Sequence, residues 1–294
     1  MMTTQFSAKL QQVAAMVIFG TIGVVVRYIG LPSSVIAFVR GVVGTVFLVL
    51  VMTMRRQKID TRAVRNNLLA LCFTGACLGG NWILLFEGYR FTTVAVATLC
   101  YYMAPMFVTL VAPLVLGEKL TGRKTLCVGV SFLGMLLVSG VVETGLPAAG
   151  ELKGILFGLG AAVLYSCVIL GNKKLRDISA MDKTIAQLAI SAVVVLPYIL
   201  LTENVAELSV TGLGLGLLAV AGIVHTGIAY LMYFGSMKDL KAQTVAIFSY
   251  IDPVVAILLS AVVLKEQMTV FGMVGAVLIL GAALVSELPG KQAE

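Results

Sequence analysis

Charged side chains are scarce in this sequence. Asp, Glu, Lys and Arg make up 12% of its 294 residues, whereas roughly 25% is usual in a soluble globular protein. Hydrophobic residues make up 60% of the chain and are gathered in long runs. The shortage of charge therefore excludes an ordinary soluble domain and predicts an all-α polytopic membrane protein.

Residues that usually carry metal or nucleophilic chemistry are also few. The chain has one His and five cysteines, and every cysteine falls inside an apolar run. None of them has the spacing of metal ligands or of a disulfide framework, and the phosphate-binding G-x-x-x-x-G-K-[ST] loop is missing. These absences argue against an enzyme and against a nucleotide-driven pump, so we expect neither a cofactor nor a bound metal.

The apolar residues form ten runs, each close to the 20 or so residues that a helix needs to cross the hydrocarbon core. The first run has no small-residue cleavage site after it, so we expect it to be retained rather than removed as a signal peptide. The predicted spans are residues 9–30, 33–54, 66–88, 93–115, 123–141, 153–172, 182–201, 211–235, 241–263 and 268–286.

The basic residues are distributed unevenly around these spans. If the N-terminus lies in the cytoplasm and the chain alternates sides, the outer loops hold only Arg90, Lys153 and Lys265. Most other Lys and Arg residues then fall on the cytoplasmic side, as the positive-inside rule requires. The net charge of +7 is therefore a topology signal, with both termini cytoplasmic in the inner membrane, and nucleic acid is not an expected partner.

Two stretches of the sequence share one pattern. YYMAPMFVTLVAPLVLGEKLT starts at position 101, and SYIDPVVAILLSAVVLKEQMT starts at position 249, so that Pro105 and Pro253 lie 148 residues apart (253 − 105). The stretches fall in the fourth and ninth predicted spans. One repeat thus contains five spans, and because five is odd the second copy enters the membrane from the opposite side. The sequence predicts two inverted five-helix repeats around a central cavity, residues 1–146 and 147–294, a design common among secondary transporters.

This duplicated pattern resembles the drug/metabolite transporter superfamily, in its EamA-type family. The resemblance is carried by the two prolines, each with a Tyr three residues before it and a Glu thirteen residues after it. It covers nearly the whole chain and implies a small-molecule carrier, with substrates that include amino acids, other metabolites and quaternary amines. The second copy departs from the first at Lys265, where the first has Gly117, and at Asp252, where the first has Ala104.

The shared Pro and Glu residues have a predicted structural role. Pro105 and Pro253 remove a backbone donor, which kinks a helix and frees a carbonyl group. The kinks either shape a cavity wall or only let the helix curve, and direct contact with substrate is the alternative. Glu118 and Glu266 each precede by three residues a Thr that can cap the following span. We expect both carboxylates to support those same helix starts through the helix dipole.

Two ionisable side chains lie near the middle of predicted spans, where insertion scales assign such groups a cost of about 2.5–3.5 kcal/mol. His225 can relay a proton or bind substrate, or it can be a neutral group that hydrogen-bonds to a neighbouring helix. Asp252 can hold a substrate ammonium when ionised and carry a proton when desolvated. Its alternative role is a protonated packing residue. We favour a functional role for Asp252 and leave both roles open for His225.

A second charged group lies nearer the outer face. Arg40 and Glu87 have predicted depths that are close enough for an ion pair. Such a pair would act as a gating lock between helices or as an anion-attracting vestibule. We expect a gating role for Arg40 and lean to a structural one for Glu87.

Several polar and aromatic side chains inside the spans are candidates for contact with a solute. Rings collected around a cavity would suit a flat or cationic solute through stacking and cation–π contact, whereas rings spread among the helices would be ordinary packing. Together with His225 and Asp252, the predicted substrate-binding residues are Asn81, Trp82, Tyr101, Tyr102, Tyr165 and Tyr230.

The sequence favours a secondary carrier that works by alternating access. On the family resemblance, export of amino acids or related metabolites is the first hypothesis. Proton-coupled uptake or antiport of an organic cation or quaternary amine is the alternative, suggested by Asp252, His225 and the tyrosines. A channel would need a continuous polar stripe or a ring of like charges, which isolated ionisable groups do not supply. The expected partners are a small organic solute, the lipid bilayer and, in the coupled case, protons; monomer and dimer both stay open.

Overall fold

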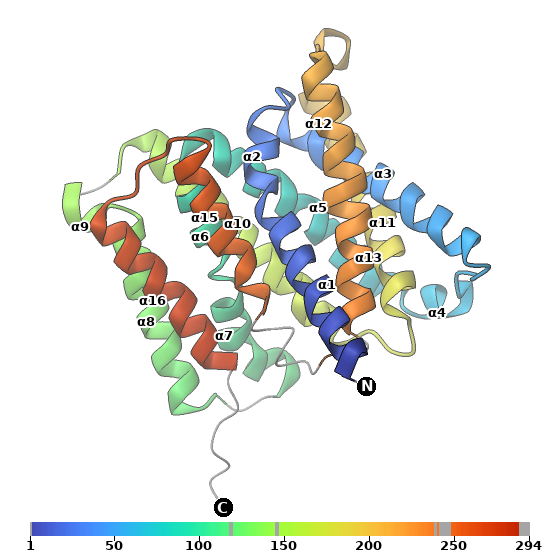
Figure 1. Ribbon diagram of the computed structural model, residues 1–294, viewed down its shortest axis with the longest axis horizontal. Helices are drawn as coiled ribbons and strands as arrows, with labels where there is room; N and C mark the ends of the chain where they lie inside the picture. The colour runs from blue at the N-terminus through green and yellow to red at the C-terminus, as the bar shows by residue number, and fades with distance from the viewer. Residues whose placement is uncertain (1, 118–119, 145–146, 238–239, 241–247, 288–294) are drawn as a thin grey trace, which may run out of the picture.

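The chain folds as a bundle of helices (Figure 1). The computed structural model describes residues 2–117, 120–144, 147–237, 240 and 248–287, and all regular structure in these ranges is helical. A backbone that crosses hydrocarbon must satisfy its own N–H and C=O groups, and a helix does so within one segment. The all-α fold class predicted from composition is therefore observed.

Seven helical segments in the described residues are long and apolar enough to cross a bilayer, which makes this a multi-pass membrane protein. They are α1–α2 (Met2–Gly20 and Ile22–Arg27), α3 (Ser33–Met54), α5 (Leu68–Phe91), α6–α7 (Val94–Tyr101 and Ala104–Leu116), α10 (Ala149–Asn172), α11 (Ala180–Thr202) and α12–η2–α13 (Gly212–Gly222, Ile223–Ile228 and Ala229–Met237).

The remaining three predicted spans contain shorter helices. These are α8 (Gly122–Val138), α15 (Ile251–Val262) and α16 (Val270–Glu287). The start of the ninth predicted span, residues 241–247, lies outside the described residues. Short connecting helices complete the chain: α4 (Thr61–Asn66), α9 (Val141–Thr144) and the 3₁₀ turn η1 (Val205–Glu207).

Three of the long segments are interrupted rather than continuous. Thr21 separates α1 from α2, Tyr102 and Met103 separate α6 from α7, and the π-helical turn η2 joins α12 to α13. Irregular backbone at membrane depth is tolerated where protein buries it or where it lines a cavity. The positions of these interruptions therefore indicate where a cavity can form.

The two repeated prolines begin helices instead of bending them. Pro105 is the second residue of α7 and Pro253 is the third residue of α15. A first-turn position has no intrahelical acceptor for its N–H, so proline fits there without losing a hydrogen bond. The predicted mid-span kink is thus replaced by a helix start. The Ser249 carbonyl oxygen, four residues before Pro253, lies 3.4 Å from the hydroxyl of Tyr102 in the break between α6 and α7.

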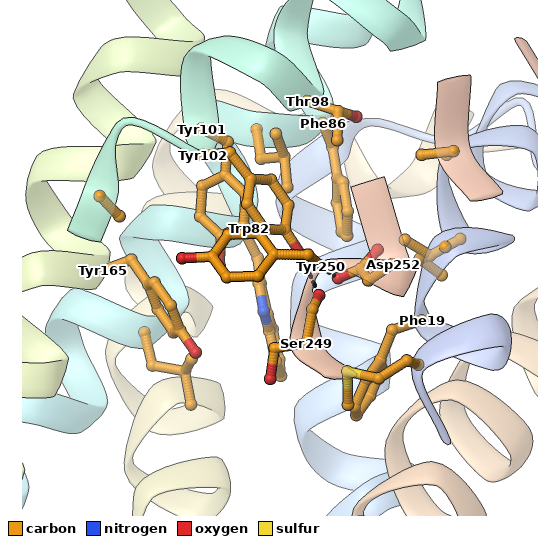
Figure 2. A pocket seen from close by; sticks show the side chains of 18 of the residues that line it. Phe19, Trp82, Phe86, Thr98, Tyr101, Tyr102, Tyr165, Ser249, Tyr250 and Asp252 are labelled. Atoms are coloured by element: carbon orange, nitrogen blue, oxygen red, sulfur yellow. Dashed lines mark hydrogen bonds between the residues drawn. The ribbon is translucent and has the colours of Figure 1, made fainter. Parts of the chain in front are cut away.

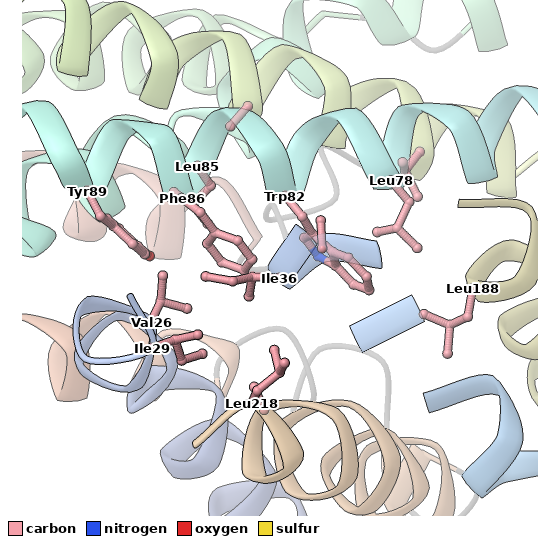
Figure 3. Close-up of a cluster of buried hydrophobic side chains, with 14 of the residues drawn as sticks. Val26, Ile29, Ile36, Leu78, Trp82, Leu85, Phe86, Tyr89, Leu188 and Leu218 are labelled. Atoms are coloured by element: carbon pink, nitrogen blue, oxygen red, sulfur yellow. The ribbon is translucent and has the colours of Figure 1, made fainter. Parts of the chain in front are cut away.

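A buried apolar cluster surrounds α5, which packs against both α10 and α11 (Figure 3). Trp82, Phe86 and Tyr89 extend from one side of α5 toward Ile36 of α3 and Val26 of α2. Burial of large side chains contributes about 1.5–3 kcal/mol each in water, and in a bilayer close packing takes over that role. The cluster fixes α5 as the central helix against which the cavity is built.

A second contact depends on glycine. Helices α8 and α16 lie side by side at one end of the bundle (Figure 1). A Cβ atom on Gly134 would lie 2.8 Å from the Gly275 carbonyl oxygen, and one on Gly275 would lie 2.5 Å from the Gly134 carbonyl oxygen. The two backbones therefore touch only because both residues lack a side chain.

Enlarging Gly134 should separate these helices. We expect Gly134→Leu to lower the unfolding temperature of the purified protein, since overpacking a close contact costs about 1–3 kcal/mol. Gly129→Leu on the same helix is the matched control, because a Cβ at Gly129 would meet nothing within 4 Å. Equal unfolding temperatures for the two variants would contradict the proposed contact.

Candidate functional site

A cavity of about 340 Å³ lies among the interrupted helices. Its walls come from α1, α2, α3, α5, α6 and α7 in the first half of the chain, and from α10, α13 and α15 in the second half. The volume falls within the range of about 300–1,000 Å³ that is usual for small-molecule sites. The cavity therefore has the size and the placement of a site shared between both halves.

Aromatic rings form much of the wall (Figure 2). The Tyr101 ring centroid lies 5.8 Å from that of Tyr102 and 5.3 Å from that of Tyr165. On another side, the Phe19 ring lies 5.4 Å from the Tyr230 ring. Edge-to-face and tilted contacts of this kind hold rings in fixed orientations, so the cavity offers stacking surfaces to a flat or apolar group.

Asp252 supplies the negative side chain of the cavity. It belongs to the first turn of α15, and the Tyr102 hydroxyl donates a hydrogen bond of 2.7 Å to its Oδ2 (Figure 2). The contact joins residues that are 150 positions apart. A carboxylate oriented by a single hydroxyl keeps capacity to accept further hydrogen bonds from a bound solute.

Arg40 supplies the positive side chain, from the first half of α3. Only 5% of Arg40 is exposed, and its guanidinium carbon lies 4.4 Å from the centroid of the Trp82 ring and 5.3 Å from that of Phe86. Its Nε donates a hydrogen bond of 3.1 Å to the Thr226 hydroxyl. The stacked aromatic face and this hydrogen bond hold the cation at the cavity wall.

The two charges of the cavity are not paired with each other. The described residues contain two ion pairs, Arg27–Glu266 and Glu87–Arg90, and neither includes Arg40 or Asp252. A buried cation without a carboxylate partner is costly unless other groups compensate it. The cavity can therefore offer one site for an anionic group and another for a cationic or hydrogen-bond-donating group.

Most of the predicted substrate-binding residues are brought together here, and two are not. Asn81 is completely buried, donates a 2.6 Å hydrogen bond to the Ala161 carbonyl of α10, and does not line the cavity. His225 is 2% exposed and also lies outside the lining. The predicted residues that line the cavity are Arg40, Trp82, Tyr101, Tyr102, Pro105, Tyr165, Tyr230 and Asp252.

His225 instead connects two interrupted helices. Its Nε2 lies 2.7 Å from the Thr21 hydroxyl at the break between α1 and α2, and its Nδ1 lies 3.3 Å from the Val220 carbonyl oxygen. Which nitrogen donates depends on the tautomer. His225 therefore lies behind the cavity wall. It contacts Thr21, whose chain neighbours Gly20 and Ile22 line the cavity.

The predicted Arg40–Glu87 ion pair is wrong. Glu87 pairs with Arg90 one turn further along α5, at 3.1 Å, and both side chains are partly exposed. Trp82 and Phe86 of α5 line the cavity. Because a helix turns by about 100° per residue, Glu87 points in a different direction from Phe86 and does not face the cavity. Similar predicted depth does not make two residues neighbours when their side chains face different directions around their helices.

Glu266 also differs from its prediction. Its carboxylate does not support α16, whose start is capped by the Thr269 hydroxyl at 3.0 Å from the Gly272 nitrogen. It accepts a 2.9 Å hydrogen bond from the backbone N–H of Val94, the first residue of α6. It also forms an ion pair with Arg27 of α2, at 2.6 Å. Ser260 of α15 donates to the same carboxylate. Glu266 thus stabilises a helix start in the other half of the chain, while Glu118 lies outside the described residues.

Comparison with known proteins identifies the family. The model of the EamA-like transporter family matches residues 8–140 and, separately, residues 152–287. The chain belongs to the EamA-like transporter family. Within the described part of this EamA-like chain, no cluster of three His, Cys, Asp or Glu side chains is arranged to hold a metal ion.

Relatives of this EamA-like protein carry transporter names. The "uncharacterized transporter YxxF" of Bacillus subtilis is 31% identical over 282 residues, which cover 95% of this chain and 89% of that one. An "uncharacterized transporter" of Archaeoglobus fulgidus is 27% identical and covers 93% of this chain and 94% of its own length. A crystal structure of a protein 19% identical superposes with a TM-score of 0.69 and covers 95% of this chain and 97% of its own, which supports the fold.

Two long-range contacts of this EamA-like protein could not be found from the sequence. Thr226 reaches Arg40 from a π-helical turn, and the hydrophobic pattern around it gives no sign of that turn. Arg27 and Glu266 are 239 positions apart, and nothing in their spacing suggests that they meet. Both contacts join distant helices, so a single sequence without its fold does not indicate them.

Glu266 should contribute measurably to stability. We expect Glu266→Gln to lower the free energy of unfolding by about 1–2 kcal/mol, between the values for exposed and buried charged contacts. Glu87→Gln is the matched control, because an exposed pair on one helix contributes about 0.5 kcal/mol or less. The readout is thermal unfolding in detergent, and an equal or greater loss in Glu87→Gln would contradict the assignment.

Proposed function

We propose that this EamA-like protein is a secondary carrier that works by alternating access and exports amino acids or related metabolites across the inner membrane. The proposed architecture is ten transmembrane helices in two inverted five-helix repeats, residues 1–146 and 147–294, with both termini in the cytoplasm. The cavity supports a shared site, since both halves contribute to its wall. Two halves of similar shape can exchange inward-open and outward-open arrangements around such a site.

One observation carries the choice of solute: the cavity holds a buried cation and a carboxylate that are not paired with each other. Arg40 and Asp252 both line it, and neither takes part in an ion pair among the described residues. A solute with a carboxylate and an ammonium group offers each of these side chains a partner of opposite charge. The free amino acid is the simplest solute of this kind.

The aromatic wall favours an apolar or aromatic side chain on that amino acid. Tyr101, Tyr102 and Tyr165 present ring faces and edges next to the carboxylate. A side chain stacked there would gain about 0.5–1.5 kcal/mol beyond its burial. L-Phenylalanine is therefore a suitable first probe.

An organic cation remains the second candidate, and Asp252 with its tyrosine neighbours is the observation that favours it. A carboxylate in an aromatic box suits a quaternary amine, and exchange of that cation for a proton on Asp252 would couple the two fluxes. Arg40 argues against it, because a second cation in the same cavity would be repelled. An amino acid meets no such penalty.

Flux in proteoliposomes tests the proposal. Labelled L-phenylalanine should enter vesicles with saturating kinetics, and unlabelled L-phenylalanine inside the vesicles should accelerate its entry. Tetramethylammonium in place of L-phenylalanine tests the second candidate. Non-saturating conductance would indicate a channel and contradict a carrier, and faster loss of label from preloaded cells that express the protein would support export.

Asp252→Asn should impair recognition of the ammonium group selectively. One lost charged hydrogen bond is worth about 1.5–3 kcal/mol, so the half-saturating concentration of L-phenylalanine should rise about tenfold or more. 3-Phenylpropionate, which has no ammonium group, should inhibit wild type and variant equally. Asp182→Asn is the control, since it neutralises another buried carboxylate that lies outside this cavity. An unchanged half-saturating concentration in Asp252→Asn would reduce Asp252 to a packing residue.

A further inference from the structure

The π-helical turn η2 carries two polar side chains that contact backbone of the preceding helix and also reach neighbouring helices. In η2, the Thr226 hydroxyl donates a 3.0 Å hydrogen bond to the Ala221 carbonyl, and the His225 ring approaches the Val220 carbonyl, in both cases five residues earlier. A π turn is rare, is wider than an α turn and is frequently found at functional sites. These hydrogen bonds fix the orientation of both side chains.

Contacts hold both groups on the Cβ of Thr226, the methyl group and the hydroxyl group. It is completely buried, and its methyl group packs against Gly44 of α3, where any Cβ would collide with it. Its hydroxyl oxygen accepts the Nε–H of Arg40 at 3.1 Å. Because the hydroxyl proton is given to Ala221, the oxygen is presented to Arg40 as an acceptor.

This arrangement leaves one edge of the Arg40 guanidinium for a ligand. Nε is bound to Thr226, and one face is stacked on Trp82. Among the described residues, no hydrogen-bond partner occupies the two Nη nitrogens. A guanidinium fixed in this way offers a planar pair of donors, which matches a carboxylate in bidentate geometry.

We infer that Thr226 is a positioning residue that sets the preference of the cavity for solutes with a carboxylate. Thr226 does not line the cavity; it acts by holding the guanidinium plane so that the Nη edge faces the solute. The inference rests on the proposed function, because it concerns recognition of the cargo of the same carrier. It names a residue outside the wall as the determinant of anion recognition.

The chain contains its own reporter for this contact. Trp82 is the only Trp in the sequence, and its ring lies 4.4 Å from the guanidinium carbon of Arg40. Binding of a carboxylate to Arg40 should therefore change the fluorescence of Trp82. Excitation at wavelengths where Tyr absorbs little selects Trp82, and a titration of the purified protein read in this way needs no transport.

Three probes and three variants make the test specific. L-Phenylalanine and 3-phenylpropionate carry a carboxylate, whereas 2-phenylethylamine does not. Thr226→Val keeps the shape and removes the acceptor, and Thr226→Ser keeps the acceptor. Thr45→Val is the matched control on α3, because the Thr45 hydroxyl bonds only to the Gly41 carbonyl of its own helix.

Thr226→Val should weaken binding of both carboxylate probes about tenfold, the factor that corresponds to about 1.4 kcal/mol, and leave 2-phenylethylamine within about twofold. Thr226→Ser should restore the wild-type preference, and Thr45→Val should retain it. A merely structural role would weaken all three probes equally, and that result would overturn the inference. Unchanged affinities in Thr226→Val, or a wild-type protein with no preference for the carboxylate probes, would overturn it as well.

Failure of this inference can be told apart from failure of the proposed function. If trans-stimulated flux of L-phenylalanine is observed and Thr226→Val keeps wild-type probe selectivity, the carrier function is supported and the positioning role of Thr226 is contradicted. If the wild-type protein shows no trans-stimulated flux of any probe, the proposed function falls and the inference falls with it.

Discussion

The need to satisfy backbone hydrogen bonds inside a bilayer governs this structure. Continuous helices meet that need wherever the chain faces lipid. A break in a helix is tolerated only where other groups replace the lost backbone hydrogen-bond partners. The breaks at Thr21, at Tyr102–Met103 and in η2 all lie beside the cavity or its supporting side chains. At these points the Tyr102, His225 and Thr226 side chains hydrogen-bond or closely approach backbone carbonyls, and the cavity is built where they do so.

The same side chains also orient the charged groups of the site. Tyr102 donates to Asp252, and Thr226 accepts from Arg40. Each hydroxyl therefore links a break in one helix to a charge on another. The carboxylate and the cation are held by neutral partners rather than by each other, which keeps both available to a solute. A direct ion pair between them would satisfy the protein and leave little for recognition.

Composition and periodicity predicted much of the fold and the wall of the cavity. Long apolar runs identified the helices, and a carboxylate inside a span pointed to Asp252. Prolines within the spans pointed to Tyr101 and Tyr102. Hydrophobic periodicity did not indicate which side of its helix faces the cavity. For that reason the predicted ion pair between Arg40 and Glu87 is wrong. Single-sequence reasoning also could not detect the π turn that brings Thr226 to Arg40, because that turn depends on packing between distant helices.

The central claim is that Arg40 and Asp252 bind opposite ends of one bipolar solute. An experimental structure with bound L-phenylalanine measures this most directly. We expect the solute carboxylate at about 2.7–2.9 Å from the Nη atoms of Arg40, its ammonium group within hydrogen-bond distance of Asp252, and its ring among the tyrosines. A solute bound elsewhere, or bound in the cavity with its carboxylate away from Arg40, would contradict the account.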